Sequence, residues 1–284
     1  MTKQPFPLWL MVCLMALIAA CDRNQASSPL HQAESVIKGV PDSAWQKLSE
    51  KKIYFGHKSV GQNIVDGIQD VLKQYPQIKL NIRESNRAED FGSPVFAHSA
   101  VGSNSNPSSK MKAFADILDK GVGEKADIAF FKFCWIDILP AMDVKMVFED
   151  YEGFMARQKE KYPQTTFIHV TVPLTSNQSG LKAWFKKGKD LIKRLIGRVN
   201  VYDNDKRHEL NEMIRQRFEG KEPFFDLAAI EAHEPGKKEG MAKERGKKDG
   251  ELIPLYTDDG GHLNALGRRI VAEHLLVLLA ELAE

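Results

Sequence analysis

From residue 52 onward, short apolar runs alternate with longer segments in which apolar residues recur every three or four positions. The runs of strand type cover residues 52–55, 79–82, 128–133, 166–172 and 224–227. The segments of helix type cover residues 61–75, 110–120, 144–161, 181–196, 206–218 and 265–282. This alternation predicts βαβ units and hence an α/β fold of three layers, α/β/α, with a mostly parallel five-stranded sheet. In such a sheet, a functional site is expected at the carboxyl ends of the strands.

The composition narrows the classes of function open to the chain. With 284 residues, of which 43% are hydrophobic, the chain is long enough for one large domain with a buried core. Its 40 Lys and Arg residues nearly balance its 38 Asp and Glu residues, which gives a formal net charge of +2. Because this charge exerts no global attraction on polyanions, nucleic acid is not expected as a partner.

The first residues of the chain predict export. Residues 8–20 form an uncharged apolar run that matches the central region of a signal peptide and is shorter than the roughly 20 residues needed to cross a membrane. The following Cys21 completes Ile18-Ala19-Ala20-Cys21, which resembles a bacterial lipobox. That resemblance implies lipidation of Cys21 and a membrane anchor. A plain secretory peptide with an incidental cysteine is the alternative.

The chain therefore divides into an expected signal peptide over residues 1–20, a flexible tether over 21–43 and a folded domain over 44–284. The location implied is the periplasmic face of a bacterial cell envelope, and Asp22 resembles an inner-membrane retention signal. Two segments interrupt the domain's alternation. They are a polar stretch at 84–107, expected to be a long functional loop, and a charged insertion at about 234–251.

Two segments place catalytic residue types at expected strand ends. Ser59 falls on the turn between the first strand and its helix, where backbone N–H groups and the helix dipole can stabilise an oxyanion. A serine in that position can equally serve as a helix N-cap. Asp259 and His262 precede the last helix and are separated by two glycines, so the carboxylate can orient the imidazole and stabilise its protonated form. A metal site would need further ligands nearby, so neither a metal nor a cofactor is expected.

These segments resemble blocks of the SGNH, or GDSL-like, hydrolase family, and the resemblance extends over most of residues 52–284. The most specific match is Asp259-Gly260-Gly261-His262-Leu263-Asn264, followed by Gly267, which resembles the block that carries the triad Asp and His. The sequence Gly56-His57-Lys58-Ser59 resembles the first block, although the family has Gly-Asp-Ser there, and it implies Ser59 as the nucleophile. The family's flavodoxin-like fold is implied as well, together with an oxyanion hole that includes the N–H groups of Ser59 and Gly102.

The third block of the family is altered in this chain. The sequence Cys134-Trp135-Ile136-Asp137 stands where the family has Gly-x-Asn-Asp, so Ile136 replaces the oxyanion-hole asparagine. Isoleucine cannot donate a hydrogen bond, and losing one such donor typically lowers turnover about 10²- to 10³-fold. Asn104 and Lys132 are candidates for a substitute donor. Asn104 is preferred because it lies beside Gly102, whereas Lys132 belongs to a strand.

The resemblance implies a serine ester hydrolase in which His262 deprotonates Ser59 and an acyl-enzyme forms. The expected substrate is a small ester or an acylated carbohydrate, with acetate as the acyl group. His57, Lys132 and His98 are candidates for lining the substrate pocket. An acyltransferase that uses the same triad is one alternative. A catalytically weak carbohydrate-binding or scaffold lipoprotein is another, and Ile136 favours it.

Overall fold

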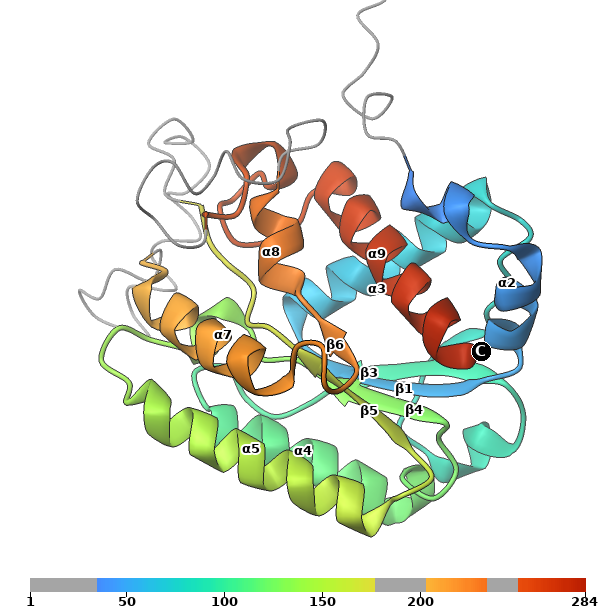
Figure 1. The fold of residues 1–284 in the computed structure, drawn as a ribbon, viewed down its shortest axis with the longest axis horizontal. Helices are drawn as coiled ribbons and strands as arrows, with labels where there is room; N and C mark the ends of the chain where they lie inside the picture. Colours follow the sequence, from blue (N-terminus) through green and yellow to red (C-terminus); the bar gives the residue numbers. More distant parts are fainter. Residues whose placement is uncertain (1–34, 177–202, 234–249) are drawn as a thin grey trace, which may run out of the picture. The chain divides into compact units, whose positions relative to one another are not determined.

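The structure, a computed structural model, describes residues 35–176, 203–233 and 250–284 (Figure 1). The expected signal peptide with Cys21, the expected helix over 181–196 and nearly all of the charged segment 234–251 lie outside these residues. The compact unit begins at Ser35. Because Ile37 is buried in the core, the end of the segment that we expected to be a tether packs on the domain, and the fold starts earlier than residue 44.

Within the described residues, six strands form one sheet in the order β2-β3-β1-β4-β5-β6. Every pair of neighbours is parallel. The strands are β1 (Lys52–His57), β2 (Ile82–Glu84), β3 (Val95–Ala100), β4 (Ile128–Phe131), β5 (Thr166–Val170) and β6 (Phe224–Phe225). The predicted α/β fold with a parallel sheet is therefore confirmed, whereas the predicted number of five strands is wrong.

The strand that the sequence analysis missed is β3, which lies inside the segment 84–107 that we expected to be a loop. Its residues, VFAHSA, contain no long apolar run, because a histidine and a serine follow the first three positions. Nevertheless β3 pairs with β1 on one side and β2 on the other, and its first five residues are buried. Pairing on both sides thus stabilises β3 as a strand, although its local sequence pattern does not indicate one.

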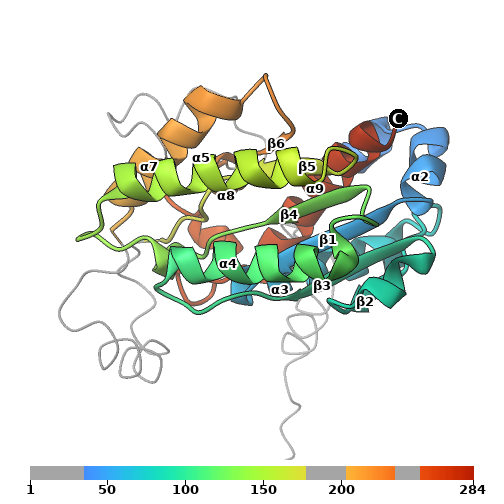
Figure 2. The ribbon, with the colours of Figure 1, turned by 90° about the horizontal axis from the view of Figure 1, so that it is seen from below.

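Helices cover both faces of the sheet, as Figure 2 shows from a second direction. One face carries helices whose apolar residues form a core with Ile53 and Phe55 of β1. These helices are α2 (Asp42–Ser49), α3 (Ser59–Gln74), α8 (Leu227–Ala232) and α9 (Ala265–Ala283). The opposite face carries helices that pack around Tyr54 and its neighbours, namely α4 (Pro107–Ile117), α5 (Val144–Lys161) and α7 (Asp205–Phe218). None of the helices that the structure describes is long and apolar enough to cross a membrane.

Helices α3 and α9 approach each other closely, and this contact positions the site. At Gly67 of α3, a Cβ atom would lie 2.2 Å from the carbonyl oxygen of Arg268 and 3.0 Å from the Cβ of Ala272, so only glycine fits. One turn further along α3, Asp70 Oδ2 accepts hydrogen bonds from Arg268 Nε at 3.0 Å and Nη2 at 2.6 Å. Two donors of Arg268 thus reach one carboxylate oxygen, and this ion pair links the two helices.

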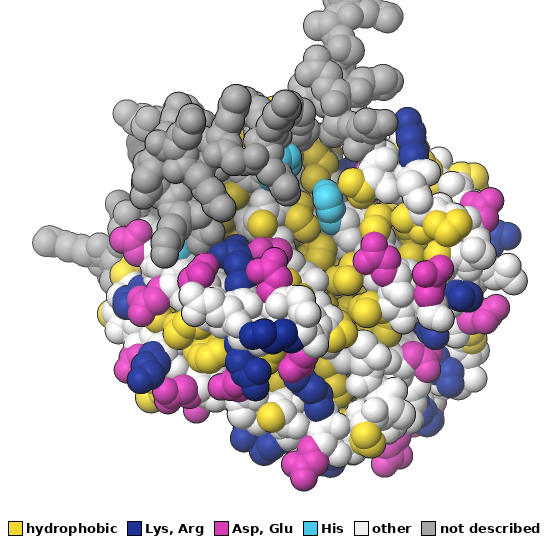
Figure 3. All heavy atoms as spheres, viewed as in Figure 1, with side chains coloured by type: hydrophobic (Ala, Val, Ile, Leu, Met, Phe, Trp, Pro, Cys, Tyr) yellow, Lys and Arg dark blue, Asp and Glu magenta, His cyan; other side chains and the backbone are white. Residues whose placement is uncertain are grey.

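The charged side chains on the face shown in Figure 3 are mixed in sign, with Lys and Arg interspersed among Asp and Glu. Elsewhere in the described residues, ion pairs within single helices join opposite charges, such as Lys112 with Asp116 in α4 and Lys206 with Glu209 in α7. Because neither positive nor negative side chains gather on this face, its charge does not indicate a binding surface. The parallel sheet points instead to its strands' carboxyl ends as the functional site.

Candidate active site

Ser59, His262 and Asp259 form one hydrogen-bonded chain, although more than 200 residues separate the first two. The distance from Ser59 Oγ to His262 Nε2 is 3.0 Å, and that from His262 Nδ1 to Asp259 Oδ2 is 2.6 Å. An ionised carboxylate only accepts hydrogen bonds, so Nδ1 carries the proton and Nε2 is free to accept from the serine hydroxyl. Ser59 is exposed to solvent, as a nucleophile must be. This arrangement can transfer the serine proton to the imidazole.

The tight turn before α9 holds the carboxylate of Asp259 in place. Its Oδ1 accepts hydrogen bonds from the backbone N–H groups of Gly261 at 2.9 Å and His262 at 2.7 Å. Partial burial raises the pKa of Asp259, but the hydrogen bonds from the His262 side chain and from these two amides outweigh burial and lower the pKa to about 2. Asp259 is therefore ionised at neutral pH and can stabilise an imidazolium on His262.

Packing between α3 and α9 brings the two halves of the triad together. Ser59 is the first residue of α3, and His262 lies three residues before α9 begins. Besides the close approach at Gly67, the side chain of Asn63 in α3 accepts a hydrogen bond from the N–H of Leu263 at 3.2 Å. The side chain of Asn264 caps α9 by accepting from two amides of its first turn. The site is thus built on the ends of two helices that are locked to each other.

Two backbone N–H groups at the strand ends have no acceptor among the described residues. They belong to Ser59, at the amino end of α3, and to Gly102, just after β3. Gly102 has a φ of +59°, and a Cβ there would lie 2.6 Å from the backbone nitrogen of Lys110, so the position requires glycine. Two unoccupied amides beside an exposed serine are what an oxyanion hole needs.

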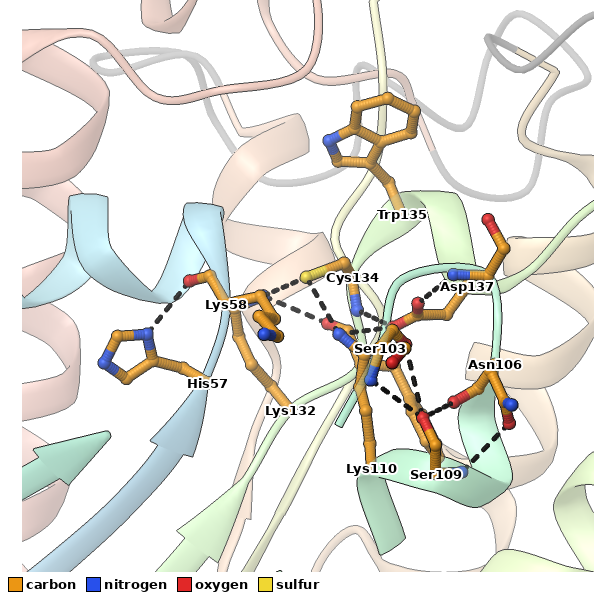
Figure 4. Close-up of polar contacts among 12 residues, drawn as sticks. His57, Lys58, Ser103, Asn106, Ser109, Lys110, Lys132, Cys134, Trp135 and Asp137 are labelled. Carbon is orange, nitrogen blue, oxygen red and sulfur yellow. Dashed lines mark hydrogen bonds and ion pairs between the residues drawn. The ribbon is translucent and has the colours of Figure 1, made fainter. Parts of the chain in front are cut away.

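Asp137 ties the loop that carries Gly102 to the turn that follows β4 (Figure 4). Its Oδ1 accepts from the N–H of Ser105 at 2.9 Å, and its Oδ2 accepts from the N–H of Cys134 at 2.6 Å. The Lys110 ammonium lies 3.0 Å from Oδ2, and both side chains are completely buried. Asp137 therefore orders the backbone that presents the second oxyanion amide.

The structure places the residue of the altered third block and the two candidate substitute donors as follows. Ile136 is half-buried and packs against the apolar core of the α3 and α9 face, as an isoleucine should. Asn104, our preferred substitute, is exposed, and its side chain makes no hydrogen bond with other described residues. Lys132 is buried, and its Nζ lies 3.0 Å from the carbonyl oxygen of Phe133 and 3.8 Å from Cys134 Sγ.

His57 and His98 form a buried pair beneath the first turn of α3. His57 Nδ1 donates to the carbonyl of Lys58 at 2.9 Å, so its Nε2 accepts from Nδ1 of His98 at 3.0 Å. A Cβ on Gly61 would lie 2.2 Å from the Cβ of His57, which shows how tightly the ring is covered. Burial lowers the pKa of His57 to about 3, and burial also lowers that of His98. Both rings are neutral at pH 7, and both are buried.

Trp135 is a site residue that the sequence analysis did not single out. Its indole lies against Gly261, where a Cβ would be 2.9 Å from the ring, and it meets the His262 ring edge-on with centroids 6.2 Å apart. The carbonyl of Trp135 accepts from Nε of Arg207 at 2.8 Å, and that guanidinium is itself buried. The indole therefore contacts the His262 imidazole from the side. The sequence could have indicated Trp135 only through its place in the altered third block, Cys134-Trp135-Ile136-Asp137.

Comparisons with known proteins give the following results. No protein-family model matches the chain, and no curated protein does. Among solved structures, a lipase/acylhydrolase from Enterococcus faecalis is 13% identical with a TM-score of 0.49, and the match covers 81% of this chain and 96% of the other. A protein described as a GDSL-like lipase from Parabacteroides merdae is 13% identical with a TM-score of 0.46, covering 83% and 99%. With identities this low, function has to be argued from the chain's own side chains.

The described residues offer no arrangement of three or more His, Cys, Asp and Glu side chains that could hold a metal ion. Cys134 is a free thiol and is buried.

Proposed function

We propose that the chain is a serine ester hydrolase of the SGNH type that works through an acyl-enzyme on Ser59. The observation that supports this most directly is the hydrogen-bonded chain from Ser59 through His262 to Asp259. The unoccupied amides of Ser59 and Gly102 add a place for the negative charge that develops on the substrate carbonyl. The proposal follows from the geometry of these groups and from the sequence resemblance.

In the first half of the proposed reaction, His262 Nε2 takes the proton from Ser59 Oγ while Oγ forms a bond to the carbonyl carbon of the ester. The electron pair of the carbonyl double bond moves to its oxygen, which the two amides stabilise. The intermediate collapses when the bond from carbon to the alcohol oxygen breaks and His262 returns its proton to that oxygen. In the second half, water repeats these steps against the acyl-enzyme and releases the carboxylic acid.

We extend the proposal to small acyl groups, above all acetyl, carried by carbohydrate, as the family resemblance suggests. The extension includes a lipid anchor at Cys21 that holds the enzyme at the periplasmic face of the cell envelope. Replacing Cys21 with Ala is then expected to move the protein from the membrane fraction to the soluble fraction. Unchanged membrane association would contradict the anchor.

A catalytically weak binding protein is the second candidate, and one observation favours it. Ile136 occupies the place of a hydrogen-bond donor and packs into the apolar core, so the site has two oxyanion donors from the backbone and none from this position. An acyltransferase would use the same triad and differ only in that a sugar hydroxyl replaces water as the acceptor.

The test compares the full chain, purified in detergent, with its Ser59→Ala and Ser103→Ala variants. Ser103 is a matched control because it is another exposed serine near the strand ends. We expect hydrolysis of p-nitrophenyl acetate and covalent labelling by a fluorophosphonate in the parent protein and in Ser103→Ala, but not in Ser59→Ala. Equal rates in the parent and Ser59→Ala would favour the binding protein, and labelling at Ser103 would refute the assignment of the nucleophile.

A further inference from the structure

The proposed oxyanion hole lacks the side-chain donor that an asparagine would supply, and few described side chains could take its place. Ile136 packs into the core, and the Asn104 side chain is exposed and makes no hydrogen bond with other described residues. Ile136 therefore supplies no donor, and the described residues do not fix the position of the Asn104 side chain. Lys132 directly follows β4, and contacts with Phe133 and Cys134 hold its side chain beside the ends of the central strands.

The register of the sheet places Lys132 next to the start of α3. Gly56 of β1 is paired with Phe131 of β4, so the next residues along the two strands, His57 and Lys132, stand side by side. Alternation along β4 puts Phe130 and Lys132 on the same face, which is the face covered by α3 and α9. Figure 4 shows the Lys132 side chain on the side of Cys134 that faces His57 and Lys58. Ser59 directly follows Lys58 in the chain.

The ammonium of Lys132 is incompletely matched by its surroundings. An ammonium has three donors, but the described acceptors are only the carbonyl of Phe133 and the thiol sulfur of Cys134. Among the described residues, no carboxylate lies within ion-pair distance of its Nζ, whereas the neighbouring Lys110 is paired with Asp137. A cation that is 1% exposed and lacks a paired anion strongly favours any negative charge that forms nearby.

We propose that Lys132 stabilises the oxyanion of the reaction in place of the missing asparagine. This inference rests on the proposed function, since the oxyanion arises only when Ser59 Oγ attacks an acyl carbonyl. As that bond forms, the carbonyl electron pair moves to oxygen and the serine proton moves to His262, so one negative charge appears beside the Ser59 and Gly102 amides. Lys132 acts on that charge from inside the protein.

The strand register puts Lys132 beside His57, two residues before Ser59, so the Lys132 charge acts on that ring. Burial is the main cause of the low pKa of His57, and the positive charges of Lys132 and Lys110 lower it further. A field that reaches His57 also acts on the first turn of α3. Because the effect passes through several ångströms of protein, we expect it to change turnover by about tenfold to a hundredfold.

The experiment compares the full chain with Lys132→Met, Lys132→Arg and Asn104→Ala, using p-nitrophenyl acetate as substrate. We expect kcat to fall about tenfold to a hundredfold in Lys132→Met with KM within about twofold, partial recovery in Lys132→Arg, and Asn104→Ala within about twofold of the parent. An arylboronic acid, which forms an anionic tetrahedral adduct on the serine, is expected to bind Lys132→Met more weakly by the same factor as kcat falls. Full activity in Lys132→Met, or a large loss in Asn104→Ala, would overturn the inference.

The pH dependence of kcat, first in the parent protein and then in Lys132→Met, provides a second test. Burial lowers the pKa of Lys132 below its ordinary value of 10.5. The charged and titratable groups that face it are His57 from β1, Lys110 from α4, Cys134 and Asp137 from the turn after β4, and Glu231 from α8. We expect kcat to decline at alkaline pH below 10.5, and this decline to be absent in Lys132→Met. A kcat that stays constant up to pH 10.5 would overturn the inference.

The failure of this inference and the failure of the proposed function give different results. If the parent protein shows no turnover and no fluorophosphonate labelling that depend on Ser59, both ideas fall together. If turnover depends on Ser59 but is the same in the parent and in folded Lys132→Met, only the role of Lys132 is refuted. The unfolding midpoint of each variant establishes that it is folded.

Discussion

Replacing Gly67 with Ala tests whether the contact between α3 and α9 sets the geometry of the triad. In an exposed helix, alanine is more favourable than glycine by about 1 kcal/mol. Here the new Cβ would lie 2.2 Å from the carbonyl oxygen of Arg268, so the helices must separate. Overpacking of this kind typically costs about 1–3 kcal/mol, and we expect net destabilisation in urea unfolding. The separation also lengthens the 3.0 Å contact between Ser59 and His262, and a misplacement of about 1 Å costs roughly 10²-fold in kcat/KM.

Gly92→Ala is the matched control, because a Cβ at that exposed glycine meets nothing within 4 Å. We expect its free energy of unfolding to stay within about 0.5 kcal/mol of the parent and its kcat/KM on p-nitrophenyl acetate to be unchanged. If Gly67→Ala were as stable and as active as the control, the helix contact would not position the triad. If it were destabilised but fully active, the contact would serve the fold alone.

Four further predictions concern buried and paired charges. Lys110→Met and Asp137→Asn each leave a buried charge uncompensated and are expected to cost about 3–5 kcal/mol in urea unfolding, whereas the double variant should cost clearly less than the sum. Asp259→Asn is expected to lower kcat about 10⁴-fold. The pKa of Asp259 is lowered to about 2, so its contribution to the free energy of unfolding is present above about pH 4 and is lost as the pH falls to 2. Unfolding followed by circular dichroism should show this loss of stability in the parent protein but not in Asp259→Asn. Burial raises the pKa of Glu231 to about 8, so stability should fall as pH rises from about 4.5 to 8, and Glu231→Gln should remove that slope in thermal unfolding.

The parts of the fold that the sequence predicts are those whose pattern is local. The helix over residues 144–161 agrees with α5, and the last helix differs from α9 by one residue. The strand β3 escaped prediction because its burial comes from pairing with β1 and β2 rather than from a run of apolar side chains. Within it, His98 and Ser99 are polar in sequence and buried in the structure.

The candidate site shows the same division. Asp259 and His262 lie three positions apart with two glycines between them, so their hydrogen bond could be predicted locally, and the turn after the first strand indicated Ser59. By contrast, the contact of Trp135 with Gly261 joins segments more than 100 residues apart, and no local sequence pattern predicts such a contact. Whether Asn104 or Lys132 faces the site also depends on tertiary packing, which a sequence pattern cannot supply.

A buried lysine without a carboxylate partner should destabilise the fold, and this gives the last prediction. Taking the ammonium of Lys132 out of water is unfavourable, and its contacts with a carbonyl and a thiol repay only part of that cost. Met has a similar length and no charge, so Lys132→Met is expected to raise the free energy of unfolding in urea by about 1 kcal/mol or more. Together with the expected loss of turnover, this result would show stability exchanged for catalysis at one position. A loss of more than about 1 kcal/mol of stability in Lys132→Met would instead show that the lysine holds the fold together, and the catalytic reading of its burial would be wrong.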